Sequence, residues 1–362
     1  MRLNPAGVEA GRILKERRET IAARVTDLYF EAHPKLELRW KDARKKCTED
    51  TRHHIDQLAE ALHLQQPVLF AEYAVWIAEL LARLRIPGEA LSSNLAILGE
   101  IASSELQDAG RAMVSSYLDA AIARITTEES QHPCYLNGTG YIDVLGRDYL
   151  AALLQGDRRL ASKLILDAVE QGSPIKEIYL HVFQRSQYEI GRLWQLNEIS
   201  VAKEHYCTAA TQLIMSQLYP LIFAGEKNDG TYVGACVAGN LHEIGGRMIA
   251  DFFEMAGWNS YFLGANTPAE SVVETLVERN ADILGISATM TGQLGAVEEL
   301  VGLVRAKSAC AGVKILVGGH PFNIAPDLWR AIDADGTARD AESAIQLAGR
   351  LVGSGAAQER SS

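Results

Sequence analysis

The hydrophobic pattern of the chain changes near residue 230, and this change constrains the fold more than any other feature. From there on, short apolar runs alternate with amphipathic stretches of helical period, and the runs cover residues 232–238, 260–263, 283–288 and 313–317. Apolar runs of strand length separated by helices indicate βαβ units and a parallel sheet that is buried on both faces. Ligands of such sheets bind at the carboxyl ends of the strands.

Small and polar residues follow three of these runs, at the edge where a ligand is expected. They lie at 240–246 after the first run, at 287–289 after the third and at 318–320 after the fourth. Glycines there would admit a ligand closely, hydroxyl groups would hydrogen-bond it, and the imidazole of His242 would project toward it. The residues therefore predict a ligand that lies across the strand ends.

This arrangement resembles the B12-binding Rossmann-like domain shared by methionine synthase, corrinoid methyl carriers, mutases and B12 photoreceptors. The resemblance rests on a histidine followed three residues later by glycine, then a Ser-x-Thr pair, then a Gly-Gly pair. It implies that cobalamin binds base-off, with His242 as the lower axial ligand of cobalt. It also implies that the nucleotide tail lies in a slot between the strands. The other cofactor-binding residues that it implies are Asn240, Leu241, Glu243, Gly245, Gly246, Gly264, Ser287, Thr289, Gly318 and Gly319.

One position departs from the family pattern. The family usually has a carboxylate two residues before the histidine, whereas this chain has Asn240. A carboxylate would accept a hydrogen bond from the imidazole and make it more electron-rich, while an amide carbonyl can only orient the ring. We therefore expect a weaker bond between cobalt and His242. The alternative for His242 is a cap of the helix that follows.

The segment before the sheet, residues 142–226, is predicted to be a four-helix bundle because it reads as four helices with short connections. In it, nine residues separate Trp194 from the pair Glu204-His205. This spacing resembles the cap of adenosylcobalamin-dependent light-sensing repressors, in which these side chains surround the adenosyl group. One straight helix would hold the groups about 15 Å apart, so a bend is needed, and we expect it at Asn197. The alternatives are a core tryptophan and a solvated Glu-His pair.

Residues 1–127 read as helices, expected at 12–30, 54–64, 70–84 and 91–125. Their histidine, aromatic and arginine positions are similar to those of globin-like sensor domains, and together with the B12 segment they resemble the photocobilins, which also bind biliverdin. The residues implied for the bilin are Arg52, His53, His54, Tyr73, Trp76, Arg83 and Arg85. The alternatives are core aromatics with surface arginines, or a heme held by His53 or His54.

Composition narrows the function classes. The net charge of −11 argues against a binder of nucleic acid or of anionic membranes, and no run of about 18 apolar residues predicts a membrane span. The five cysteines are scattered and show neither a disulfide framework nor the spacing of a metal site. Reduced thiols of this kind favour a location in the cytoplasm. We expect a linker at 128–141, a B12 domain at 227–355 and a tail at 356–362.

The resemblances together imply a light-sensing photoreceptor that is not an enzyme and binds adenosylcobalamin and biliverdin. Loss of the adenosyl group in light would change the arrangement of the domains and the size of a homo-oligomer, a dimer or tetramer, and so signal to a downstream partner. Two alternatives stay open at this point. One is a corrinoid methyl carrier of a methyltransferase system, and the other is a globin-type heme sensor fused to a B12 domain.

Overall fold

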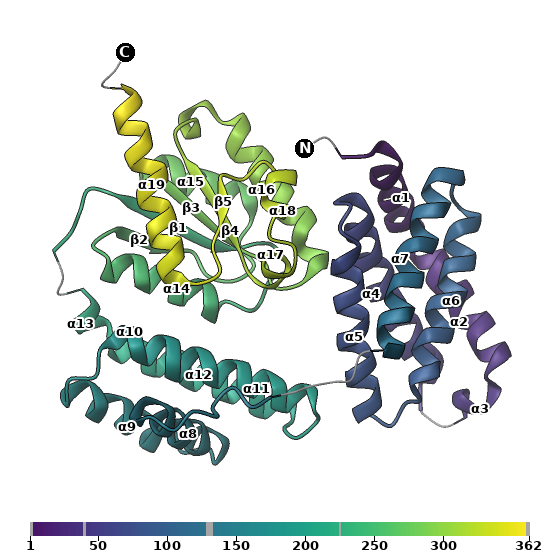
Figure 1. Ribbon diagram of the computed structural model, residues 1–362, viewed down its shortest axis with the longest axis horizontal. Helices are drawn as coiled ribbons and strands as arrows, with labels where there is room; N and C mark the ends of the chain where they lie inside the picture. Colours follow the sequence, from purple (N-terminus) through teal and green to yellow (C-terminus); the bar gives the residue numbers. More distant parts are fainter. Residues whose placement is uncertain (1–2, 39–40, 128–132, 224–225, 360–362) are drawn as a thin grey trace.

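The computed structural model describes residues 3–38, 41–127, 133–223 and 226–359, with side chains described as far as Gly353. Three parts follow one another along the chain (Figure 1): an all-helical N-terminal domain, a helical cap and an α/β domain with a parallel sheet. This confirms the fold class that the sequence predicts. Of the expected linker, residues 128–132 lie outside the described part of the chain.

The helices of the N-terminal domain enclose an apolar core that is continuous with the core of the α/β domain, and a smaller cluster lies around Tyr29 and Phe30. They are α1 (Pro5–Glu16), α2 (Arg18–Ala32), α3 (Pro34–Glu37), α4 (Ala43–His63), α5 (Pro67–Arg83), α6 (Gly88–Ser104) and α7 (Asp108–Thr127). Two expected helices are each divided, at Arg17 and between Ser104 and Asp108. At the second break the Arg111 side chain donates to the carbonyls of Ser103 and Leu106, which satisfies acceptors that the end of a helix leaves free.

The cap is a bundle, as predicted. Its elements are α8 (Tyr141–Leu154), α9 (Arg158–Glu170), a rod of α10 (Ile175–Glu177), the π-helix η1 (Ile178–Gln184) and α11 (Arg185–Gln195), then α12 (Val201–Gln217) and α13 (Tyr219–Ile222). Asn197, with φ of 57°, forms the expected bend between α11 and α12. The helix expected over 200–222 ends early, because Pro220 cannot donate a backbone hydrogen bond.

The α/β domain holds five parallel strands in the order β2-β1-β3-β4-β5 within the described residues. They are β1 (Thr231–Cys236), β2 (Asn259–Phe262), β3 (Ile283–Ser287), β4 (Lys314–Gly318) and β5 (Gly336–Thr337). The sequence did not predict β5, which is only two residues long.

Helices cover both faces of this sheet. The longer ones are α14 (Ile244–Met255), α15 (Ala269–Glu278), α16 (Leu294–Ala306) and α19 (Ala341–Glu359), and the shorter are η2 (Thr291–Gln293), η3 (Ser308–Cys310), α17 (His320–Ile324) and α18 (Leu328–Ala331). α14 and α19 pack on one face, and α15 and α16 pack on the other. α19 continues to Glu359, so most of the segment expected as a tail is helical, and residues 360–362 lie outside the described chain.

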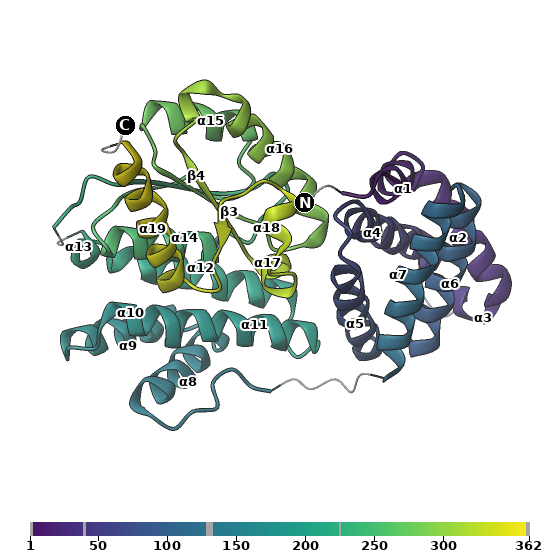
Figure 2. The ribbon, with the colours of Figure 1, turned by 45° about the horizontal axis from the view of Figure 1, so that its top comes forward.

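The cap lies along the α/β domain, and the N-terminal domain lies beside both (Figure 2). α4 contacts η2, while α5 contacts α11 of the cap and α17 of the α/β domain. His63 Nε2 lies 2.8 Å from Glu298 Oε2 across this boundary. Among the described helices, none is long and apolar enough to cross a membrane.

Candidate functional site

The loop between β1 and α14 carries His242 at the carboxyl edge of the sheet. The imidazole is exposed, and the backbone N–H of His242 donates to Asn240 Oδ1 at 3.1 Å. The N-cap position of α14 belongs to Glu243, so His242 does not cap the helix. Leu241, another predicted cofactor residue, is 75% exposed beside it. The loop thus presents an imidazole at the edge where a ligand of the sheet would lie.

Asn240 fixes this loop to the sheet. Its side chain is fully buried, and its Nδ2 donates to the carbonyl oxygen of Ser287 at the end of β3, at 3.0 Å. With Oδ1 taken by the backbone of His242, the amide engages main-chain groups and not the imidazole ring, contrary to the ring-orienting role expected for it. Asn240 therefore positions the histidine through the loop backbone.

Glu243 ties the same loop to two other elements. Its Oε1 accepts from Gln212 Nε2 of α12 at 2.8 Å, and its Oε2 accepts from the backbone N–H of Ala265 at 3.0 Å. Ala265 follows Gly264, which has φ of 88° and turns the chain after β2. One carboxylate thus joins the His242 loop, the cap and the second strand-end loop.

The sheet face under α14 and α19 carries a strip without large side chains toward the strand ends. Tyr232, Ile283 and Leu316 on this face pack against those helices. Because side chains alternate along a strand, the next residues on the face are Gly234, Gly285 and Gly318, with Cys236 and Ser287 beside them. Gly234 and Gly285 lie within the strands and not at their ends, so they were not among the predicted residues, although strand alternation places them on this face.

Tyr232 forms the inner end of this strip. A Cβ atom added to Gly285 would lie 2.1 Å from the Tyr232 hydroxyl oxygen, so only glycine fits there. On the helix side, a Cβ on Gly246 would come within 3.1 Å of Cys236 Sγ, whereas Gly245 faces open space. Burial raises the pKa of the Cys236 thiol to about 11, so this thiol stays neutral beside the strip. The Tyr232 ring thus lies over both Gly234 and Gly285, so a narrow group would enter along this strip only if that ring moved.

The loops after β3 and β4 are fixed by hydrogen bonds of the Gln293 side chain and by a close backbone approach at Gly319. The N–H of Thr289 donates to Gln293 Oε1 at 2.8 Å, and Gln293 Nε2 donates to the carbonyl of Gly239 at 3.1 Å. Gly319 has φ of 109°, and a Cβ atom there would lie 1.9 Å from the carbonyl oxygen of Ala288. The predicted residues after β1, β3 and β4 are therefore brought together at one edge.

Only some of the cofactor-binding residues predicted on the cap lie near the His242 loop. Glu204 accepts from Thr208 Oγ1 at 2.9 Å, and residues 204, 208 and 212 lie four apart on the side of α12 that reaches Glu243. His205 lies beside Glu204 but its side chain is 75% exposed. Trp194 stacks on Trp76 of the N-terminal domain, with ring centroids 6.2 Å apart, and no described contact joins it to Glu204.

The residues predicted for a bilin are not collected in one slot. His54 is a buried core residue whose Nδ1 lies 2.8 Å from the Tyr73 hydroxyl, and burial lowers its pKa to about 4. Arg52 pairs with Glu19 at 2.6 Å, and His53 is exposed. Arg83 and Arg85 are exposed at the far end of α5. The His54–Tyr73 bond also leaves that histidine engaged in the core, which does not favour the heme alternative.

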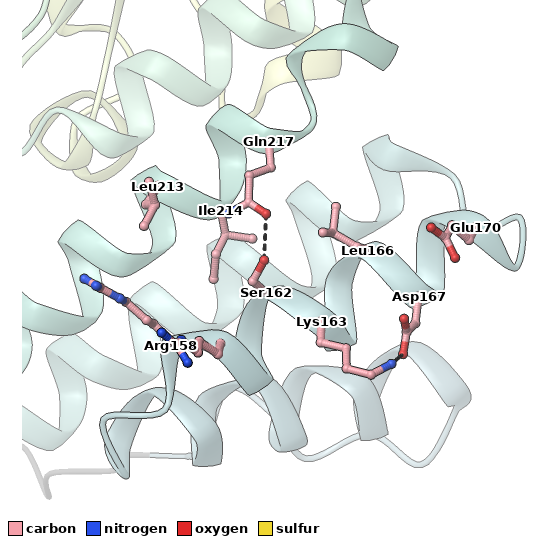
Figure 3. A pocket seen from close by; sticks show the side chains of 10 residues that line it. Arg158, Ser162, Lys163, Leu166, Asp167, Glu170, Leu213, Ile214 and Gln217 are labelled. Carbon is pink, nitrogen blue, oxygen red and sulfur yellow. Dashed lines mark hydrogen bonds and ion pairs between the residues drawn. The ribbon is translucent and has the colours of Figure 1, made fainter.

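Of two cavities in the described chain, one lies outside the predicted site and the other adjoins it. One of about 410 Å³, between α9 and α12, is lined by residues including Arg158, Lys163 and Leu213 (Figure 3), and it contains none of the predicted residues. The other, of about 360 Å³, adjoins Glu243 and Gly264. It contains Asp251, whose carboxylate accepts from the Tyr179 hydroxyl at 2.9 Å and whose pKa burial raises to about 6.

Comparison with known proteins identifies two B12-binding segments in the chain. Residues 230–346 match the family model described as B12 binding domain, and residues 145–219 match a second model with the same description. These two segments are the α/β domain and the cap. The chain is thus a cobalamin-binding protein built from a helical cap and a Rossmann-like domain, as predicted.

The relatives narrow the family further. A corrinoid protein of Desulfitobacterium hafniense is 27% identical over 56% of this chain and 94% of its own length. The dimethylamine corrinoid protein of Methanosarcina barkeri is 30% identical over 46% of this chain and 75% of its own. Among solved structures, the monomethylamine corrinoid protein of Methanosarcina barkeri is 22% identical, with a TM-score of 0.49 over 56% of this chain and 95% of its own. The chain belongs to the corrinoid proteins.

This membership corrects the predicted function. The sequence predicted a light-sensing photoreceptor, and that prediction is wrong, because the relatives are corrinoid proteins, one of them named a dimethylamine corrinoid protein. The spacing from Trp194 to Glu204 misled the prediction, since Trp194 packs on the N-terminal domain. The methyl-carrier alternative is the better supported one.

Proposed function

We propose that this chain is a corrinoid carrier that accepts a methyl group from one protein and passes it to another. The observation that carries the proposal is the exposed imidazole of His242, in a loop that Asn240 and Glu243 fix at the strand ends. The relatives support this class of carrier, since one of them is named a dimethylamine corrinoid protein.

The residues fit cobalamin on two counts. An exposed imidazole is a suitable ligand for cobalt, and the strip at Gly234, Gly285 and Gly318 would admit a narrow tail once the Tyr232 ring moved off it. When bound, cobalamin would supply a cobalt centre that takes up and releases a methyl group. His242 would hold the cobalt, and Glu204 lies on the side of α12 that reaches Glu243.

In this role the chain binds and presents its cofactor, and separate partner proteins catalyse the transfers. A position in the cytoplasm agrees with the five free cysteines, all of which lie in the described chain. Biliverdin in the N-terminal domain and a homo-oligomer stay predictions that the carrier function does not require. The adenosyl form of the cofactor is the sequence-based prediction that the carrier function replaces.

The carrier function is tested on the cofactor that the protein retains from cells grown with cobalamin. We expect extracted cofactor with a methyl or water upper ligand, separated by chromatography in dim light. A stoichiometric adenosyl form would contradict the proposal. A red absorption band after purification would reveal biliverdin and decide that prediction separately.

The ligand role of His242 is tested by retention of hydroxocobalamin during gel filtration. His242→Ala should weaken retention at least about tenfold, since a metal–ligand bond and its orientation are lost. His205→Ala is the matched control, because His205 is also exposed but lies on the cap. Equal retention by both variants would remove His242 from the site.

A further inference from the structure

The N-terminal domain and the α/β domain share one buried apolar core. Leu58 and Leu62 of α4 belong to the same continuous cluster as Leu294 and Val297 of α16. α4 also packs against η2, the short turn between β3 and α16, and it lies on the side of its domain that faces the α/β domain (Figure 1). Because a shared hydrophobic core opposes relative motion of domains, α4 is a fixed neighbour of the strand ends.

Gln57 of α4 carries this contact to η2. The residue is 7% exposed, and its Oε1 accepts a hydrogen bond of 3.1 Å from the backbone N–H of Gly292. The N–H groups in the first turn of a helix have no acceptor within that helix, so Gln57 supplies one that η2 lacks. A Cβ atom on Gly292 would come within 3.1 Å of Gln57 Nε2, which shows how closely the turn approaches. The N-terminal domain thereby fixes the position of η2.

Gln293, the next residue of η2, extends this contact to the loop of His242. Its Oε1 accepts from the N–H groups of Thr289 and Met290, at 2.8 and 3.0 Å. Its Nε2 donates to the carbonyl oxygen of Gly239 at 3.1 Å. Gly239 has φ of 78° and lies three residues before His242. Two glutamine side chains therefore connect α4 with the loop that presents the imidazole.

This connection adds to the other anchors of the loop. Asn240 and Glu243 fix its middle and its end, whereas the bond from Gln293 fixes its beginning. The B12-binding matches cover residues 145–219 and 230–346, so Gln293 lies within them and Gln57 does not. The N-terminal domain thus supports the loop from outside the two matched segments.

We propose that Gln57 is a positioning residue for cobalamin: through Gln293 it holds the beginning of the loop and so sets the place of the His242 imidazole. Gln57 acts on the loop and need not touch the cofactor. This inference rests on the proposed carrier function, because it gives the N-terminal domain a part in cobalamin binding. The rival is a purely structural role, in which Gln57 only stabilises the boundary between the domains.

Matched variants separate these two roles. Gln57→Met removes the acceptor and keeps the length of the side chain, while Gln57→Glu keeps an acceptor oxygen. Gln57→Ala takes the place of the methionine variant should that variant not fold. His63→Ala is the control, because His63 lies on the same helix but reaches α16 through Glu298 and does not bond η2.

The first readout is amide hydrogen exchange of the full chain without cobalamin, measured by mass spectrometry. Two N–H groups in the segment 239–242 donate to side-chain amides, so they exchange when the loop opens. We expect Gln57→Met to speed exchange about two- to tenfold at both 289–293 and 239–242, since one hydrogen bond is lost. Gln57→Glu should lie closer to the unaltered chain, and His63→Ala should change neither segment.

The second readout is made on the loaded protein. Gln57→Met should weaken retention of hydroxocobalamin about two- to tenfold. With ¹⁵N-labelled histidine, it should also lower the fraction of bound Co(II) cobalamin whose electron paramagnetic resonance lines show a ¹⁵N doublet. The double variant Gln57→Met, Gln293→Met should retain cobalamin no more weakly than Gln293→Met alone, because both residues act in one chain of contacts. His63→Ala should match the unaltered chain.

The outcomes separate the two proposals. If the chain retains cobalamin but Gln57→Met matches His63→Ala in exchange at 239–242 and in retention, the positioning role is wrong and the carrier function stands. Faster exchange at 289–293 alone would show that the contact ends at η2, which would also overturn the positioning role. If the unaltered chain retains no cobalamin, the carrier function fails, and with it this inference.

Discussion

The Asn240 side chain donates a hydrogen bond of 3.0 Å to the carbonyl of Ser287, which joins the His242 loop to the end of β3. The same amide accepts from the backbone of His242. A residue that departs from the family's acidic pattern thus serves as a two-sided clamp. The position of the histidine depends on a donor that a carboxylate would lack.

This clamp predicts that Asn240→Asp does not improve the site. An aspartate in this buried position could accept from His242 but would face the Ser287 carbonyl without a proton to donate. We expect a loss of about 1–3 kcal/mol in the free energy of unfolding, together with weaker cobalamin retention. Urea unfolding and gel filtration measure the two effects. Retention tighter than in the unaltered chain would show that the carboxylate acts on the imidazole.

Glu243 is expected to couple the cap to the His242 loop. Glu243→Ala removes two hydrogen bonds to a carboxylate, and Glu243→Gln keeps one acceptor oxygen. The alanine variant should lose about 2–3 kcal/mol of stability and the glutamine variant less. Gln212→Ala should lose only the contact with the cap. Equal effects of Glu243→Ala and Gln212→Ala would mean that the bond to Ala265 contributes nothing.

Two glycines should tolerate no side chain. Gly319→Ala combines a φ of 109° with a Cβ 1.9 Å from the Ala288 carbonyl, and Gly285→Ala would collide with Tyr232. Each should cost several kcal/mol, roughly 3 or more, in thermal or urea unfolding. Gly302→Ala on α16 is the control, because its Cβ meets open space and alanine should stabilise the helix by up to about 1 kcal/mol. Normal stability of Gly285→Ala would show that Tyr232 is free to leave the strip.

Asp251 should make stability fall as pH rises. Its pKa is raised from 3.8 to about 6 in the folded chain, so between these values the folded state binds a proton that the unfolded state has released. The difference is worth at most about 3 kcal/mol and is fully present below pH 4 and lost above pH 6. Asp251→Asn should remove this dependence.

The measurement compares urea unfolding of Asp251→Asn and the unaltered chain from pH 4 to 7. The comparison is needed because His54, with its pKa lowered to about 4, has the opposite effect and makes stability rise over the same range. The difference between the two proteins isolates Asp251. A constant difference across this range would mean that Asp251 is ionised in its cavity.

Much of the fold follows from local patterns. The apolar runs predicted four strands because each was bounded by turn residues, and Asn197 was the expected bend because a straight helix could not bring Trp194 and Glu204 together. β5 could not be predicted, because its two residues show no periodicity. The break after Ser104 depends on the side chain of Arg111, which the apolar pattern does not report.

The site was predicted less completely. His242 and the loops after β3 and β4 were visible because small polar residues follow apolar runs, but the clamp formed by Asn240 depends on a neighbour in another strand. The stacking of Trp76 on Trp194 joins residues far apart in sequence, and no local pattern signals it. Without that contact, the spacing of Trp194 and Glu204 alone pointed to the wrong function.

The central claim is that His242 would be a ligand of cobalt in the loaded protein, and electron paramagnetic resonance tests it most directly. The protein is prepared with ¹⁵N-labelled histidine, loaded with unlabelled cobalamin and reduced to the Co(II) form. We predict that the nitrogen splitting of the cobalt lines changes from the triplet of ¹⁴N to the doublet of ¹⁵N, and that His242→Ala loses the doublet. A triplet that persists with labelled histidine, or a doublet that survives in His242→Ala, would contradict the account.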